Sequence, residues 1–120
     1  MNWNINKSNP ICPQIYENIC VGIANGTLAP KSKLPSVREL AVELGVNPNT
    51  VQKSYTLLEE EGIVYSVPAS GRYVSENIEL AVKVVSSIRD KKIDIFIQEM
   101  KQLGYSNEEV IKYIKERYGE

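Results

Sequence analysis

The chain has no histidine and only two cysteines, Cys12 and Cys20, among its 120 residues. Histidine is the side chain that most often transfers protons near neutral pH, and structural zinc sites combine several cysteines and histidines. Two thiols at this spacing match no zinc-binding pattern and form no disulfide framework in a reducing compartment. The sequence therefore predicts neither a metal site nor a fold held by disulfides.

Motifs of common enzymes are also missing. The sequence has no glycine-rich phosphate-binding loop and no Gly-x-Ser-x-Gly elbow that would present a serine nucleophile. Its acidic residues are scattered along expected helices, as on a solvated surface. We therefore expect a protein that is not an enzyme and needs no cofactor.

Long hydrophobic runs are absent as well. No apolar run approaches the roughly 20 residues of a membrane-spanning helix, and Met1 is followed by polar residues rather than by a secretory signal. The composition, 42% hydrophobic and 24% charged, is typical of a globular chain. We expect a cytoplasmic protein with one compact domain and an appendage, and with no membrane partner.

Residues 33–62 carry the signals of two short helices joined by a tight turn. Ser36 and Glu39 have the spacing of a capping box at the start of the first helix. Asn47 suits the N-cap of the second helix, and Pro48 suits its first position. This order predicts a helix-turn-helix, a module that lays its second helix in the major groove of DNA.

The second helix has an apolar face and a polar face. Val51, Tyr55 and Leu58 recur at helical spacing on the side that would be buried. The opposite side would carry amides, a hydroxyl and one cation, from Asn49, Gln52, Thr56 and Lys53. The same pattern also fits an ordinary helical hairpin whose outer face is merely solvated.

A short β-hairpin is predicted directly after this helix. Residues 63–67 favour a strand, residues 68–71 a turn, and Tyr73 begins a second strand. Such a hairpin makes the module a winged helix. Gly71 and Arg72 lie at the wing tip, where backbone can approach DNA closely and a guanidinium can enter the minor groove or contact a phosphate.

Over roughly residues 10–75, the chain resembles the DNA-binding domain of GntR-type bacterial transcription regulators. The similarity is carried by the segments PICPQIYENICVGIANGTLAPKSK and LPSVRELAVELGVNPNTVQKSYTLLEEEGIV. Only a short segment follows the wing, which resembles the short YtrA-type subfamily. Position and this resemblance also suggest a short strand at Trp3 and Ile5 that pairs with the wing or with a partner subunit.

The resemblance implies a double-stranded DNA partner with an inverted-repeat operator. The DNA-contacting set that it implies is Ser36, Arg38, Asn49, Thr50, Gln52, Lys53, Gly71 and Arg72. Asn49 and Gln52 could recognise adenine, and Lys53 a guanine or a phosphate. Many relatives have arginine at the positions of Pro48 and Gln52, so their operator sequence does not carry over to this chain.

Residues 76–120 have a different pattern, with two apolar helices separated near Gly104 and a second capping box at Ser106 and Glu109. These helices either fold back on the winged helix or pair with a second copy of the chain. We expect a homodimer, because two such helices cannot bury their apolar faces alone and because the YtrA-type resemblance also implies a dimer. The predicted fold is therefore mainly α with a small β wing, with a winged helix-turn-helix in residues 1–75 and a helical dimerisation segment in residues 76–120.

The function predicted from the sequence is a dimeric repressor of an operon, which in the resembled subfamily is often related to a transporter. A small-molecule effector of unknown identity is possible for such a regulator. Two alternatives remain: a winged helix that binds only protein partners, and a regulator that senses redox state through Cys12 and Cys20. Cys12 would lie at a helix start, where a thiol pKa can fall, whereas Cys20 would lie in the core.

Overall fold

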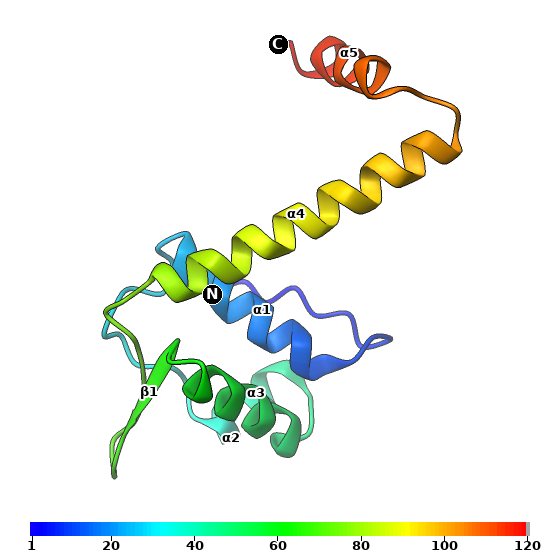
Figure 1. Cartoon of the computed structure of the whole chain (residues 1–120). Helices are drawn as coiled ribbons and strands as arrows, with labels where there is room; N and C mark the ends of the chain where they lie inside the picture. Colours follow the sequence, from blue (N-terminus) through cyan, green and yellow to red (C-terminus); the bar gives the residue numbers. More distant parts are fainter. Residues whose placement is uncertain (120) are drawn as a thin grey trace. The chain divides into compact units, whose positions relative to one another are not determined.

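A computed structural model describes residues 1–119 (Figure 1). In this range, five helices and a two-stranded antiparallel sheet follow one another along the chain. Their bounds are α1 (Ile11–Ala24), α2 (Val37–Leu44), α3 (Pro48–Glu60), β1 (Val64–Val67), β2 (Gly71–Val74), α4 (Glu79–Gln102) and α5 (Asn107–Tyr118). The prediction of a mainly helical fold with a small β wing is confirmed. None of the helices in residues 1–119 combines the length and the hydrophobicity that a membrane crossing requires.

Local capping interactions define the helix-turn-helix. The Ser36 hydroxyl accepts a hydrogen bond from the Glu39 amide at 3.1 Å, and the Glu39 carboxylate accepts one from the Ser36 amide at 3.0 Å. α2 ends at Leu44, and its C-cap Gly45 has a left-handed φ of 66°, which suits glycine. The Asn47 side chain then accepts from the Asn49 amide at 2.8 Å and starts α3. Both helix starts thus form as their sequences predict.

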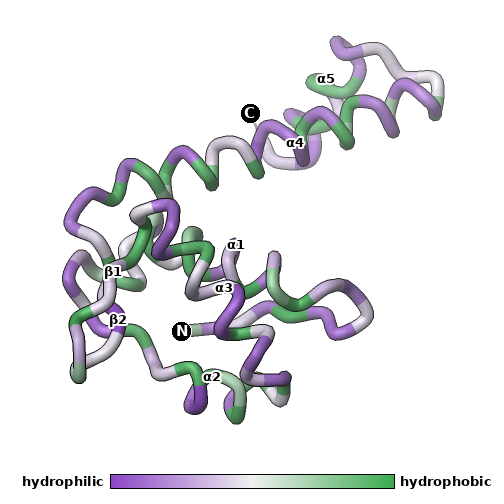
Figure 2. The backbone as a smooth tube through the Cα atoms, turned by 60° about the horizontal axis from the view of Figure 1, so that its bottom comes forward, coloured by the Kyte–Doolittle hydropathy of each residue, from purple (hydrophilic) through white to green (hydrophobic). Residues whose placement is uncertain are grey.

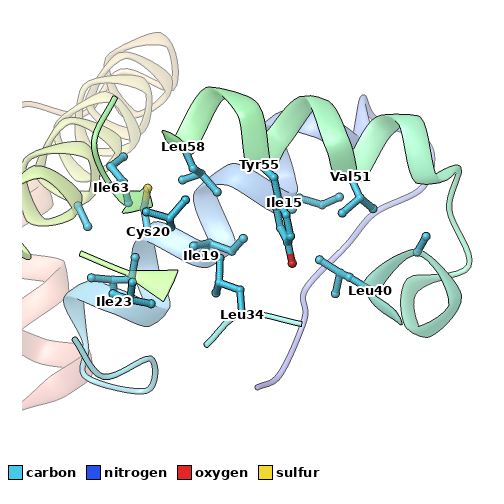
Figure 3. Packing of buried hydrophobic residues seen from close by; sticks show 14 residues of the cluster. Ile15, Ile19, Cys20, Ile23, Leu34, Leu40, Val51, Tyr55, Leu58 and Ile63 are labelled. Carbon is cyan, nitrogen blue, oxygen red and sulfur yellow. The ribbon is translucent and has the colours of Figure 1, made fainter. Parts of the chain in front are cut away.

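One hydrophobic core joins α1, α2, α3 and the wing (Figure 3). Ile15 and Ile19 of α1 pack against Val51 and Tyr55 of α3, and all four side chains are at most 1% exposed. Tyr55 is the largest of the fully buried side chains, and its hydroxyl donates to the Pro35 carbonyl at 2.8 Å. Burial of its ring also raises the pKa of this phenol above its usual range. The core therefore fixes α3 between α1 and the segment that leads into α2.

The wing pairs with the segment before α2. Val64 and Val74 face each other across the β1–β2 ladder, and both are buried. On its other side, β2 forms an isolated bridge between Tyr73 and Lys33, and the Leu34 amide donates to the Arg72 carbonyl at 2.8 Å. The wing is thus held by residues 31–34 as well as by its own hairpin.

The strand expected at Trp3 and Ile5 does not form. Residues 1–6 are irregular, and the two apolar side chains pack against the core instead. Their segment is held by side-chain amides of α1: Gln14 accepts from the Asn6 amide at 2.7 Å, and Asn18 accepts from the Asn4 amide at 3.3 Å. These amide contacts replace a strand ladder, and the place beside β2 is taken by Lys33.

Two compact units divide the chain, one from Met1 to Val85 and one that begins at Ser86. The first unit extends past Ser75, where the sequence-based boundary falls, because the start of α4 contributes to the core. Ala81 is 1% exposed, and Ile78 and Val84 pack against the same cluster. α4 therefore begins as part of the winged-helix unit.

The second unit holds the rest of α4 and all of α5. Ser106 and Glu109 form the expected capping box at the start of α5. Apolar positions alternate with polar ones along both helices (Figure 2), but Val110 is the only hydrophobic residue of this unit, within the described range, that is buried. Large side chains that remain exposed include Ile93, Ile95, Leu103, Ile111 and Tyr118.

A truncation series tests the boundary. A fragment of residues 1–85 should unfold cooperatively, because it keeps the whole core. A fragment of residues 1–75 should have a free energy of unfolding lower by at least about 3 kcal/mol, since Ala81 and its apolar neighbours are lost from the core. Urea denaturation followed by circular dichroism measures the difference. Equal stabilities would show that the start of α4 is not part of the core.

Candidate nucleic-acid interface

The outer face of α3 presents polar side chains to solvent. Asn49, Gln52 and Lys53 are exposed, and Thr50 is half-buried. The Gln52 amide nitrogen donates to the Thr56 hydroxyl at 3.2 Å, so these two side chains lie together on the same face. The helix thus offers amide donors and acceptors, a hydroxyl and a cation on the side away from the core, which suits reading of base edges.

A hollow of about 380 Å³ opens between the start of α2, the middle of α3 and the wing. Five of the predicted DNA-contacting residues line it: Ser36, Arg38, Gln52, Gly71 and Arg72. Asn49, Thr50 and Lys53 lie on α3 outside this hollow. The fold therefore brings residues from three separate elements to one concave surface, as a nucleic-acid backbone would require.

The start of α2 forms one rim of the hollow. The Ser36 backbone amide donates to the Glu39 carboxylate, and this hydrogen bond is the main cause that keeps the pKa of Glu39 below its usual range. Because the capping box already uses the Ser36 and Glu39 amides, a phosphate at this rim would depend on the Ser36 hydroxyl proton and on Arg38. Arg38 is exposed.

The wing forms the opposite rim. Gly71 has a φ of 138°, which L side chains rarely adopt, and a Cβ built there would lie 2.9 Å from Cε of Lys33. Lys33 therefore lies directly against the wing tip. The charge pattern of the sequence places Lys33 on the expected DNA face, although the contact set implied by the family resemblance omits it. Its position beside β2 comes from the bridge to Tyr73.

Arg72 is not free at this rim. Its Nε donates to the Glu59 carboxylate, and its guanidinium lies 5.2 Å from the centre of the Tyr55 ring. Ser66 donates to the same carboxylate oxygen at 2.7 Å. The hydrogen bonds from Ser66 and Arg72 hold the pKa of Glu59 below its usual range. The predicted DNA-contacting arginine is thus engaged within the protein.

Exposed positive and negative side chains gather at different places on the winged helix, although the net charge of the chain is −1. Lys33, Arg38 and Lys53 are exposed, and none of them forms an ion pair with another described residue. Glu60 and Glu61 are exposed near the far end of α3. Of the charges that line the hollow and have no ion-pair partner among the described residues, Lys33 and Arg38 outnumber the single carboxylate of Glu39, and Lys53 adds a cation on α3. This net cationic surface suits the phosphates of a nucleic acid.

The two thiols lie on α1, and neither lines the hollow. Cys20 is fully buried, and burial, followed by the charge of Glu61, raises its pKa to about 12. Cys12 is only partly exposed, and its carbonyl accepts from the buried Ser54 hydroxyl at 2.9 Å. A thiol with so high a pKa is a poor nucleophile, so Cys20 behaves as a core residue. Residues 1–119 contain no cluster of side chains that could bind a metal ion.

The helix-turn-helix, the following hairpin and the cationic hollow define the class of this protein: it is a winged-helix DNA-binding regulator. The family model described as "Bacterial regulatory proteins, gntR family" matches residues 13–74. The chain belongs to the GntR family of transcription regulators, whose members are regulators rather than enzymes.

Two curated relatives are similar over nearly the whole chain. The uncharacterised HTH-type transcriptional regulator YhcF of Bacillus subtilis (strain 168) is 35% identical over 96% of this chain and 95% of its own length. The HTH-type transcriptional repressor YtrA of the same organism is 36% identical over 92% of this chain and 85% of its own length.

Solved structures agree with this assignment. A GntR family transcriptional regulator from Listeria monocytogenes superimposes with a TM-score of 0.82 at 38% identity, covering 93% of this chain and 98% of that one. The DNA-binding domain of AraR, solved in complex with operator ORX1, superimposes with a TM-score of 0.53 at 28% identity, over 62% of this chain and 92% of that one.

Thiol labelling tests the assignment of Cys20 to the core. Iodoacetamide at mildly alkaline pH should modify native protein once, at Cys12, because the Cys20 thiol is buried and its pKa lies far above the pH of the reaction. Intact-mass measurement and peptide mapping locate the adduct, and unfolded protein, which should take two, is the control. Labelling of native Cys20 at the rate of Cys12 would support redox sensing through this pair.

Proposed function

We propose that this protein is a dimeric, sequence-specific DNA-binding repressor. The observation that supports the proposal best is the concave cationic surface formed by the start of α2, the outer face of α3 and the wing. The relative YtrA is named a repressor, and the AraR structure, in which the same kind of domain is bound to an operator, supports DNA as the ligand. By the same resemblance, the target is the control region of an operon, with a transporter operon as the first candidate.

The side chains divide into two roles on this proposal. Asn49 and Gln52 lie on the exposed face of α3 and recognise base edges in the major groove, where paired amide contacts suit adenine. Ser36 and Arg38 contact phosphates from the rim of the hollow, and Lys53 adds a cation on α3. Thr50 adds a hydroxyl on the first turn of α3, and Gly71 at the wing has no side chain to obstruct close approach of the DNA backbone.

The second unit forms the dimer interface on this proposal. Two apolar grooves, of about 480 and 390 Å³, run between α4 and α5, and aromatic and aliphatic side chains line them. Ile93, Phe96 and Ile111 are all at least 40% exposed, although each is large and apolar. A unit with so small a buried core needs a partner surface to cover its apolar side chains. A second copy of the chain offers the same apolar helices in a self-complementary arrangement.

A dimer also compensates for the small number of cations in each subunit. Two winged helices related by a two-fold axis would place their α3 helices about 34 Å apart, one turn of DNA, on an inverted repeat. Binding of one half-site then raises the effective concentration of the second domain.

Salt dependence of binding tests the DNA ligand. A duplex obtained by binding-site selection should lose affinity with a log–log slope of about −4 to −7, because a dimer neutralises roughly four to eight phosphates at about −0.9 per contact. Fluorescence anisotropy at several salt concentrations measures the slope. A slope near zero with every duplex would exclude binding through phosphate contacts.

Variants within the same titration separate the two roles. Asn49→Ala or Gln52→Ala should weaken binding to the selected duplex by about 1–3 kcal/mol and change binding to random duplex little. Arg38→Ala should weaken both by similar factors. The division of roles fails if the α3 amides and Arg38 change specific and random binding alike.

Charge substitutions in the apolar grooves test the dimer. Ile93→Asp or Ile111→Asp should convert the protein to a monomer, because an unpaired carboxylate in a desolvated apolar contact is costly. Sedimentation velocity gives the oligomeric state. Val85 is unsuitable for this test, because its side chain packs against the core of the first unit.

Gln98→Asp is the matched control, since Gln98 is an exposed polar residue of α4 that lines neither groove, and the substitution also changes the net charge by −1. It should leave the dimer intact and so show that added negative charge alone does not dissociate it. A dimer that survives both isoleucine substitutions would place the interface elsewhere.

A further inference from the structure

A polar cluster connects the wing to α3, the recognition helix that the proposed function places in the major groove. Glu59 lies on the last turn of α3, Ser66 on β1 and Arg72 on β2, so the cluster joins the three elements that follow one another from the helix into the wing. Both Arg72 and Ser66 donate hydrogen bonds to the same carboxylate oxygen, Oε1 of Glu59. The ion pair is therefore a connection between secondary-structure elements and not a pair within one helix.

This cluster is shielded from solvent more than the other ion pairs of the described residues. The side chains of Arg72 and Glu59 are 23% and 30% exposed, whereas those of Lys31, Glu76, Arg89 and Asp90 all exceed 60%. Partial burial strengthens an ion pair, because water screens it less, and it makes the loss of one partner costly.

The aromatic ring of Tyr55 contacts the guanidinium of Arg72 in this cluster. Arg72 lies 5.2 Å from the ring centre, and Tyr55 is fully buried and held by its hydrogen bond to Pro35. A cation over a fixed aromatic ring gains further attraction. Arg72 would have to give up a carboxylate and a ring contact to reach a phosphate.

We propose that Arg72 and Glu59 are positioning residues, which clamp the wing at a fixed angle to α3 and so place the wing tip on DNA. This inference rests on the proposed DNA-binding function. It also assigns the direct DNA contact beside the wing tip to Lys33, whose exposed side chain lies against Gly71 at the rim of the hollow.

The sign of the effect of Glu59→Gln distinguishes the clamp from a simple restraint on Arg72. If the clamp positions the wing, Glu59→Gln weakens binding about three- to thirtyfold, because the contact that orders the wing is lost. If Glu59 merely withholds Arg72 from DNA, the same change frees a cation and removes an acid, and binding becomes tighter.

Glu60→Gln is the matched control, because Glu60 is an exposed acid at the next position of the same helix. It makes the same change in net charge without touching the cluster, so any general electrostatic gain appears in both variants. The clamp predicts that Glu59→Gln binds more weakly than Glu60→Gln. Equal or tighter binding by Glu59→Gln overturns the clamp.

The salt dependence of DNA binding is a measurement that a loss of protein stability alone would not change. Arg72→Lys keeps the positive charge but loses the Nε donor to Glu59. If Arg72 only positions the wing, this variant should bind DNA more weakly with an unchanged salt slope. Lys33→Ala should instead make the salt slope shallower by about 1 per subunit. If Arg72 contacts a phosphate, Arg72→Lys binds nearly as tightly as the unaltered protein, and Arg72→Ala makes the slope shallower instead. That second pattern overturns the proposal.

A measurement without DNA separates the clamp from the proposed function. In urea unfolding, Glu59→Gln and Arg72→Ala should each destabilise the first unit, and the double variant should be less destabilised than the sum of the two. Strict additivity overturns the clamp whether or not the protein binds DNA. If the coupling is present and the protein binds no duplex, the proposed function fails while the contact itself stands.

Discussion

The burial of Tyr55 is the interaction on which the rest of the winged helix depends. One face of its ring completes the core between α1 and α3, its hydroxyl donates to the Pro35 carbonyl just before α2, and Arg72 of the wing lies over the ring. The capping boxes start the helices, but they do not set the angles between them. One residue of α3 thus fixes the place of α2 and of the wing relative to the recognition helix, and these are the three elements that surround the cationic hollow.

Local features of this fold follow from the sequence, because their causes are local. The capping box at Ser36, the left-handed Gly45 and the apolar face of α3 depend on residues within a few positions of one another. The wing hairpin is also recognisable, since its strands are joined by a short turn. The exposed side chains of α3 follow from the same periodicity, which is why the polar residues predicted to face DNA do lie at the surface.

The rest depends on contacts between distant parts of the chain. The pairing of Lys33 with Tyr73, the packing of Ala81 into the first unit and the engagement of Arg72 by Glu59 each join segments that no short motif relates. The sequence pattern marks Arg72 as a cation at a wing tip, but a partner on the preceding helix follows from no local motif. The predicted domain boundary at Ser75 differs from the observed one for a related reason. The apolar pattern of α4 is continuous, so the sequence does not show which part of the helix packs into the core of the first unit.

The scarcity of exposed cations gives the geometry of the wing its importance. A strongly basic regulator can tolerate a loosely held wing, because many phosphate contacts compensate for poor placement of any one. In this chain, Lys33, Arg38 and Lys53 are the cations around the recognition surface that form no ion pair with a described residue. On the proposed function, each of them would have to meet a phosphate with little freedom lost on binding, which favours a wing that is already fixed before DNA arrives. Holding Arg72 in an internal ion pair removes one cation from the surface, but on the proposed clamp it would fix the wing against which Lys33 lies at Gly71.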